Sequence, residues 1–303
     1  MSPVPIGPRA AWAIGLVSAV GLVAFAWPLV APAQSAAVAH ADEAPWLFAL
    51  IVPALLAIAL ATLADGALDA KAVAIIGVLA AVVCALRPLG GGTAGLEPIW
   101  IILILGGRVL GPGCGFLLGA VALFTSGLVT GGVGPWLPYQ MLAAGWVAMG
   151  AGLLPAADGR AEIALLAGYG AVASLAYGLL MNLWFWPFTT SLPEAIAYQP
   201  GADPAANLVG WLRFTLLTSL GYDIPRAVLT VVLIIIAGRP ILAAIRRATR
   251  RAAFGAVPAF EPSTTTVLST TTVLSTTDDP SDLSAPSAAR SAGEGRPVRK
   301  GTT

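Results

Sequence analysis

Charged side chains are scarce in this chain. Only 10% of its 303 residues are charged and 57% are hydrophobic, whereas a soluble domain carries roughly 25% charged residues. A soluble globule of this length has too few charges here to cover its surface. The apolar residues lie almost entirely before Arg251, in continuous runs such as 231–237. Such runs exclude a membrane β-barrel, whose strands alternate apolar and polar residues, and predict an all-α integral membrane protein.

Histidine, cysteine and lysine are equally scarce, and each scarcity argues against a kind of site. The single histidine, His40, disfavours a haem or a multi-histidine metal site. Cys84 and Cys114 both lie in apolar segments, which is typical of packing residues rather than of a disulfide. Neither Lys71 nor Lys300 follows a glycine-rich phosphate loop, so no Walker-type nucleotide site is predicted. A net charge of +1 gives no bulk attraction to nucleic acid. We therefore expect no metal, no cofactor and no nucleic-acid partner.

Catalysis is also poorly supported. A hydrolase needs a nucleophile and an activating base, but Ser174 and Ser219 have no histidine within a span. The acidic residues lie at the ends of apolar runs or in loops, not deep in helices where a proton-coupled pump would carry them. We expect a protein that is not an enzyme, and whose energy comes from another protein if it transports.

The apolar runs predict about eight membrane spans, at roughly 20 residues for each. The fourth is too short to cross the bilayer alone and is predicted to be short or partly re-entrant, ending at Gly106, Gly107 and Arg108. An aromatic, proline-rich segment over 186–220 precedes the last span. The predicted spans cover about 11–30, 45–63, 72–86, 99–105, 111–129, 138–154, 163–184 and 224–237.

Three parts follow from these spans. Residues 1–70 hold two extra amino-terminal helices, 71–251 a six-helix core, and 252–303 a disordered low-complexity tail in which STTTVL occurs twice in succession. The arginines after the last span predict that this end is cytoplasmic, and eight spans return the amino terminus to the same side. Small residues over 39–41 leave cleavage of the first span as an alternative, with seven spans remaining.

Several polar and aromatic side chains are predicted at the outer ends of the helices. Polar groups in or near hydrocarbon usually face a cavity, a partner or a ligand. An ion pair between Asp223 and Arg226, three residues apart, and an interfacial belt of tryptophans are the simpler explanations of single residues. The convergence of many such groups predicts a ligand pocket instead. Its candidate residues are Arg87, Glu97, Tyr139, Gln140, Asn182, Trp184, Trp186, Asp223 and Arg226.

Each candidate has an expected role. Hydrogen bonds to the ligand are assigned to Tyr139, Gln140, Asn182 and Asp223, and stacking to Trp184 and Trp186. The two arginines either meet an anionic group of the ligand or hold the loops through Glu97 and Asp223.

Two stripes of small residues have helical spacing. Gly77, Ala81 and Ala85 form the first, and Gly111, Gly115 and Gly119 form the second. Small residues let membrane helices approach closely. Each stripe therefore either docks on a partner protein or packs within the chain.

Five longer blocks resemble the substrate-specific S component of energy-coupling factor (ECF) transporters, and are most similar to its actinobacterial branch. The similarity covers about 71–251. The blocks are GGTAGLEPIW, ILGGRVLGPGCGFLLGA, GGVGPWLPYQMLAAGWVAMGAGLLP, YGLLMNLWFWPF and SLGYDIPRAVLTVVLIIIAGRPIL.

The resemblance implies a six-helix protein of the bacterial plasma membrane that captures a vitamin or a metal ion. Such a protein associates with a transmembrane coupling protein, the T component, and two cytoplasmic ATPases, and it hydrolyses nothing itself. Its first core helix docks on the coupling protein through an alanine-x-x-x-alanine motif. That role maps onto Ala81 and Ala85, with Gly77 one turn earlier. The loop after this helix, 90–97, would cover the ligand.

The chain departs from the minimal family pattern in its two extra helices and in lacking a multi-histidine amino terminus. The second departure disfavours a metal ion, so an organic vitamin is expected. Cobalamin is the first candidate, while thiamine, a flavin or an aromatic precursor remain open. A membrane scaffold and a self-contained secondary transporter remain as alternative functions.

Overall fold

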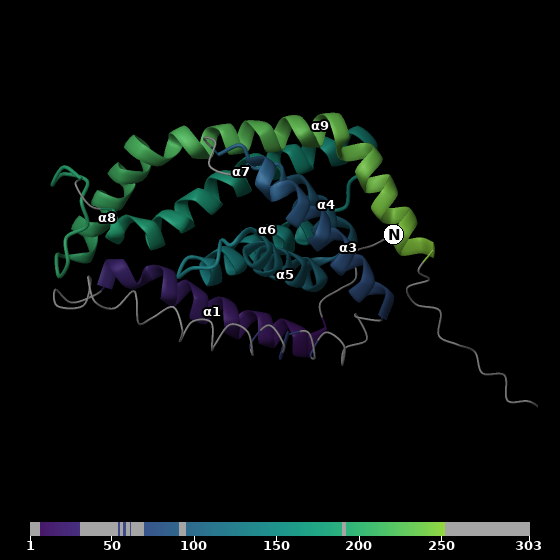
Figure 1. Ribbon diagram of the computed structural model, residues 1–303, viewed down its shortest axis with the longest axis horizontal. Coiled ribbons are helices and arrows are strands. Elements are labelled where there is room, and N and C mark those ends of the chain that lie inside the picture. Colours follow the sequence, from purple (N-terminus) through teal and green to yellow (C-terminus); the bar gives the residue numbers. More distant parts are fainter. Residues whose placement is uncertain are drawn as a thin grey trace, which may run out of the picture. The chain divides into compact units, whose positions relative to one another are not determined.

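The computed structural model describes residues 7–30, 70–90, 95–189 and 192–251, together with positions 54, 57, 58 and 61. Within these ranges the regular structure is helical and includes no strand, as predicted (Figure 1). Most of the predicted second span, the tip of the predicted covering loop (91–94) and the carboxyl-terminal tail lie outside the described residues.

Eight α-helices are described, and short 3-10 or π turns follow three of them. The turns are 3-10 at Arg87–Gly90 and Trp186–Phe188 and π at Thr215–Ser219. The helices are α1 (Pro8–Val30), α3 (Ala70–Leu86), α4 (Ile99–Leu110), α5 (Pro112–Thr130), α6 (Leu137–Leu153), α7 (Gly159–Phe185), α8 (Pro204–Phe214) and α9 (Leu220–Arg251).

Five helical segments among the described residues are long and apolar enough to cross a membrane: 8–29, 72–90, 112–130, 159–188 and 204–250. This number fits a multi-pass membrane protein but does not reach the eight predicted spans. The 12 residues of α4 extend only about 18 Å at the α-helical rise. The hydrocarbon layer is about 30 Å thick, so α4 cannot cross it alone, as its short apolar run predicted.

Several predicted boundaries are wrong. Helix α4 does not end at Gly106, Gly107 and Arg108 but continues to Leu110. The last predicted span, 224–237, is part of one helical run over 204–251 that includes Pro225 and Pro240. Proline and aromatic residues suggested breaks, but membrane helices tolerate proline because neighbouring helices and local π turns satisfy the freed backbone groups. The π turn at Thr215–Ser219 joins α8 to α9.

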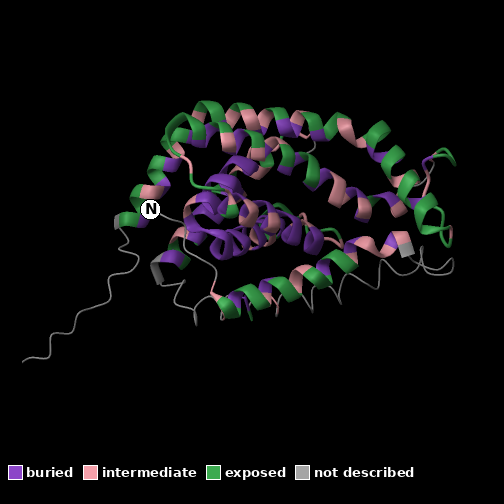
Figure 2. Cartoon of the chain, turned by 180° about the vertical axis from the view of Figure 1, so that it is seen from behind, coloured by how far each residue is buried: buried purple, intermediate pink, exposed green. Residues whose placement is uncertain are grey.

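The centre of the core is formed by α4, which is almost entirely buried, and by α5 and α6, which are largely buried (purple in Figure 2). Glycines allow their backbones to touch. A Cβ atom on Gly107 would overlap the Ala148 carbonyl oxygen, and one on Gly119 would overlap the Ala144 carbonyl oxygen. A Cβ atom on Gly115 would lie 2.8 Å from the Ala148 carbonyl oxygen. The second small-residue stripe therefore packs within the chain.

The first stripe has the opposite environment. Helix α3 buries Ile76, Leu79 and Val83 against the core, while Gly77, Ala81 and Ala85 are exposed. A Cβ atom on Gly77 would meet no atom within 4 Å. This face of α3 is free of contacts with the described part of the chain.

Helix α1, one of the two extra helices, packs on α6. The Trp146 indole donates a hydrogen bond to Ser18 Oγ at 2.8 Å. The Tyr139 hydroxyl donates to the Ala24 carbonyl oxygen at 3.3 Å, and the Phe25 ring lies edge-on to the Tyr139 ring, 4.8 Å away. The extra helix thus holds side chains of the core.

Two glycine-to-alanine substitutions test the contact between α5 and α6. Gly119→Ala places a methyl group against backbone atoms, and we expect it to lower the free energy of unfolding by about 1–3 kcal/mol, as overpacking does. Gly168→Ala on α7 has open space and should be neutral or stabilising, because alanine favours a helix. Thermal unfolding in detergent measures both. Equal midpoints would show that the backbones do not touch.

Candidate functional site

A cluster of charges joins the start of α9 to the segment before α4. Arg226 Nε lies 3.0 Å from Glu97 Oε2, and Arg226 Nη1 lies 2.6 Å from Asp223 Oδ1. We call Glu97, Asp223 and Arg226 the Arg226 cluster. The predicted pair between Asp223 and Arg226 is confirmed. Arg226 also has a second partner, Glu97, which lies 129 positions earlier in the chain.

Two aromatic side chains enclose this cluster. The Trp100 indole donates a hydrogen bond to Glu97 Oε2 at 2.8 Å. The Arg226 guanidinium carbon lies 5.2 Å from the centre of the Tyr177 ring, and the Trp100 and Tyr177 rings meet edge to face at 4.4 Å. Arg226 is 8% exposed and Asp223 3%. A buried arginine is tolerated only where carboxylates and an aromatic face compensate its lost hydration, as they do here.

Two glycines permit the close approach of these segments. Gly95 has φ +76°, a left-handed conformation that side chains disfavour, and a Cβ there would overlap the Tyr222 carbonyl oxygen. On α7, a Cβ on Gly178 would overlap the Asp223 carboxylate. Both positions therefore require a residue without a side chain if Asp223 and Glu97 are to meet the same arginine.

Arg87 follows α3 and faces α6 rather than the Arg226 cluster. Its Nη2 donates a hydrogen bond to Gln140 Oε1 at 2.8 Å. Its Nη1 is enclosed by the protein and has no hydrogen-bond partner among the described residues. Two roles were predicted for the arginines. Arg226 has the second of these, because it holds a loop through Glu97 and Asp223. The open donor belongs to Arg87.

Asn182 uses its amide within the protein. Its Nδ2 donates to Thr215 Oγ1 at 3.2 Å, and its Oδ1 accepts from the Ser219 hydroxyl at 2.8 Å. These bonds tie α7 to the π turn between α8 and α9. The amide is 7% exposed, so it positions the turn and has little surface for a ligand.

The aromatic candidates divide into two groups. Trp184 stacks on Phe188 at 5.7 Å between ring centres and lies 6.2 Å from the Tyr139 ring. Trp186 is fully buried in a separate cluster with Ile196 and Phe214, and its indole donates to the Ile196 carbonyl oxygen at 2.7 Å. Trp184 and Trp186 are buried by protein, so neither belongs to a lipid-facing belt, and Trp186 does not join the other candidates.

A second buried network lies at the opposite ends of α4, α7 and α9. Glu162 Oε1 lies 3.0 Å from Arg108 Nε and 2.6 Å from Arg246 Nη2. Arg108 also donates to the carbonyl oxygens of Leu154 and Pro155, at 2.8 and 3.0 Å. We call Arg108, Glu162 and Arg246 the Glu162 network. From the sequence, these residues were expected only as charges flanking the spans.

Sequence reasoning missed Trp100, Tyr177, Thr215 and Ser219 as partners of the candidate residues. Trp100 had a local signal, since it lies three residues after Glu97, about one helical turn. The other three had none. They reach the site through contacts between helices distant in sequence.

The charged candidate residues offset one another. Arg87 and Arg226 balance the carboxylates of Glu97 and Asp223, so these four residues carry no net charge. Among the described residues, no group of three or more histidine, cysteine, aspartate or glutamate side chains has the geometry of a metal site. The group best placed to meet a ligand is the open Nη1 donor of Arg87, beside Gln140.

The chain matches no model of a known protein family, and neither a curated protein nor a solved structure is similar to it.

Removal of the positive charge tests the Arg226 cluster. Arg226→Gln leaves the buried Asp223 carboxylate and the part-exposed Glu97 carboxylate unneutralised, and we expect it to lower the free energy of unfolding by about 3 kcal/mol, as breaking a buried ion pair does. Adding Asp223→Asn should restore part of the loss because it removes one of the two charges. Exposed Arg213 on α8 offers the control Arg213→Gln, expected within about 0.5 kcal/mol of wild type. Unfolding in detergent measures these free energies. A free energy of unfolding for Arg226→Gln equal to that of the control would contradict the cluster's role.

Proposed function

We propose that this chain is the substrate-capture subunit, or S component, of an ATP-driven ECF importer in a bacterial plasma membrane. It binds an organic micronutrient from the outer face, and cobalamin is the first candidate. A transmembrane coupling protein and two cytoplasmic ATPases supply the energy. Both termini of the chain are cytoplasmic in this proposal, and the six helices of 71–251 form the binding core.

The observation that carries the proposal is the convergence of polar groups at one end of the helices. Arg87 bonds to Gln140, 53 positions later in the chain, and Glu97 pairs with Arg226, 129 positions later. A membrane protein keeps such groups at one site when they neutralise one another or meet a ligand. The Arg226 cluster is explained by neutralisation. Arg87 is not, because its Nη1 is enclosed without an acceptor in the part of the chain that the structure describes, and a ligand oxygen would provide one.

The chemistry of this end suits an amphipathic organic ligand. The rings of Tyr139, Trp184 and Phe188 lie close to one another and offer stacking surface. Tyr139 itself is held by α1 through its hydroxyl. A charge-balanced group of residues with one open cationic donor favours a ligand that carries an oxygen acceptor, such as an amide, a carboxylate or a phosphodiester.

The exposed face of α3 supports the second half of the proposal. Gly77, Ala81 and Ala85 lie on one side of the helix and leave its backbone open to a partner. In a bilayer, association of helices depends on such small residues because no hydrophobic gain is available between them. This face would dock on the coupling protein.

The same face favours one alternative, a membrane scaffold that packs partner helices without a ligand. The two functions differ in small-molecule binding. A secondary transporter differs from both because it would take up its substrate in vesicles that lack ATPases.

A vitamin screen with the purified full-length chain tests ligand capture. We expect cobalamin, or else another vitamin of the panel, to raise the thermal unfolding midpoint. Arg87→Gln should weaken the binding of that vitamin at least tenfold, because a hydrogen bond to a charged group contributes about 1.5–3 kcal/mol. Loss of the bond to Gln140 should itself lower the midpoint without ligand, so vitamin affinity is compared between variants that remain folded, and Arg213→Gln serves as the control. The proposed site would be contradicted if no vitamin stabilised the protein, or if Arg87→Gln bound the vitamin as tightly as wild type.

Bulky substitutions on α3 test docking separately. Ala81→Leu with Ala85→Leu should prevent co-purification with the coupling protein and ATPases while leaving vitamin binding unchanged, because leucine keeps the helix backbones apart. Ala176→Leu, at an exposed position of α7, is the control. Complexes retained by the double variant would show that this face does not dock.

A further inference from the structure

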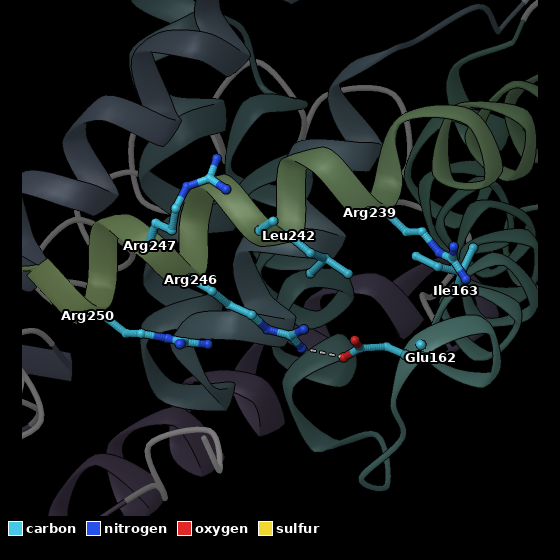
Figure 3. A pocket seen from close by; sticks show the side chains of 9 residues that line it. Glu162, Ile163, Arg239, Leu242, Arg246, Arg247 and Arg250 are labelled. Atoms are coloured by element: carbon cyan, nitrogen blue, oxygen red, sulfur yellow. Dashed lines mark hydrogen bonds and ion pairs between the residues drawn. The ribbon is translucent and has the colours of Figure 1, made fainter.

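A basic pocket opens beside the Glu162 network, at the ends of α7 and α9 (Figure 3). Its volume is about 340 Å³. Four arginines of α9 line it, namely Arg239, Arg246, Arg247 and Arg250. Leu242 and Ile163, both buried, add apolar wall, and Glu162 is its one acidic residue. Four guanidinium groups around one carboxylate leave a strong excess of positive charge.

The single carboxylate is already occupied. Glu162 Oε1 is shared by Arg246 and by buried Arg108 (Figure 3 shows the bond from Arg246). No carboxylate among the described residues pairs with Arg239, Arg247 or Arg250. Glu162 therefore orients Arg246 towards the pocket, while three further guanidinium groups have donors for an external anion.

The start of α7 adds to this preference. Gly159, its first residue, lines the pocket. The side chain of the preceding Asp158 makes no capping hydrogen bond, so it does not occupy the first amide groups of this 27-residue helix. Free amides at a helix start favour anions, and guanidinium groups bind phosphate oxygens with paired hydrogen bonds.

The position of the pocket along α9 indicates where the anion comes from. Arg226 and Arg246 are twenty residues apart, which is about 30 Å of helix, the thickness of the hydrocarbon layer. If the Arg226 cluster lies at one membrane surface, the pocket therefore lies at the other. Val232, Ile235 and Ile236 are exposed on the stretch of α9 just before Arg239. An apolar helix surface thus leads to a basic pocket at the level of lipid headgroups.

We propose that this pocket binds the phosphate of an anionic phospholipid, with the acyl chains against the exposed apolar residues of α9. Basic pockets between helices on the cytoplasmic side are a known form of lipid headgroup site. The site is distinct from the proposed vitamin site, which lies at the opposite ends of the same helices. Bound lipid joins α7 to α9 and fixes the basic end of the chain at the membrane surface.

Lipid titration of the full-length chain in a neutral detergent tests the proposal. Phosphatidylglycerol should raise the thermal unfolding midpoint at concentrations at least tenfold lower than phosphatidylcholine does. The double variant Arg239→Gln with Arg250→Gln should weaken the binding of phosphatidylglycerol about fivefold for each arginine removed. One basic side chain near an anionic surface contributes about 1 kcal/mol. Both arginines are exposed and pair with no carboxylate among the described residues, so the fold should survive, as the midpoint without lipid verifies.

Two comparisons separate this site from general attraction between charges. Arg213→Gln, at the opposite end of the helical run over 204–251, removes charge outside the pocket and should leave phosphatidylglycerol binding unchanged. Inorganic phosphate at the same concentrations should not displace the lipid. The proposal is overturned if both lipids act equally, if Arg213→Gln weakens binding as much as the pocket variant, or if inorganic phosphate competes as well as phosphatidylglycerol.

Discussion

A charge buried between apolar helices must be neutralised by the protein itself, because the bilayer offers no water to do it. Two networks meet this requirement, and both connect the same three helical regions. The Arg226 cluster joins the start of α9 to the segment before α4 and to Tyr177 of α7. The Glu162 network joins the other ends of α4, α7 and α9. A shift of any one helix along its axis would break pairs at both ends, so the two networks together set the register of the core.

Between these networks the helices pack by backbone contact. Gly107 and Gly119 bring α4 and α5 against α6 so closely that a single methyl group would overlap a carbonyl oxygen. This packing explains how α4, too short to cross a bilayer, belongs to a membrane protein, since other helices enclose nearly all of it. Small residues have the opposite role on α3, where Gly77 and Ala81 remain exposed. The same residue type thus closes the interior of the core and leaves one outer face open for the proposed coupling protein.

The two ends of the core differ in their charge balance. At the end with Arg226, carboxylates match arginines, and the Nη1 of Arg87 is enclosed without an acceptor among the described residues. At the end with Glu162, arginines greatly outnumber carboxylates. A balanced site with one open donor suits a small molecule that must be bound and released. An excess of guanidinium groups suits an abundant anion that stays bound. The proposed ligand site and the proposed lipid site thereby lie at opposite ends of one bundle.

Local features of the sequence were enough to predict the all-helical membrane class and most of the helix positions. They also predicted the short fourth helix and the pair between Asp223 and Arg226. Each of these depends on residues within one helix or one apolar run. They also indicated which end of the helices carries the candidate polar residues. The tertiary structure alone decided that Glu97 shares Arg226, that Asn182 bonds to the π turn, that Trp186 lies in a separate cluster and that α9 continues through two prolines. These outcomes depend on contacts between segments as many as 129 positions apart, and spacing along the chain carries no record of which distant helix will supply a partner.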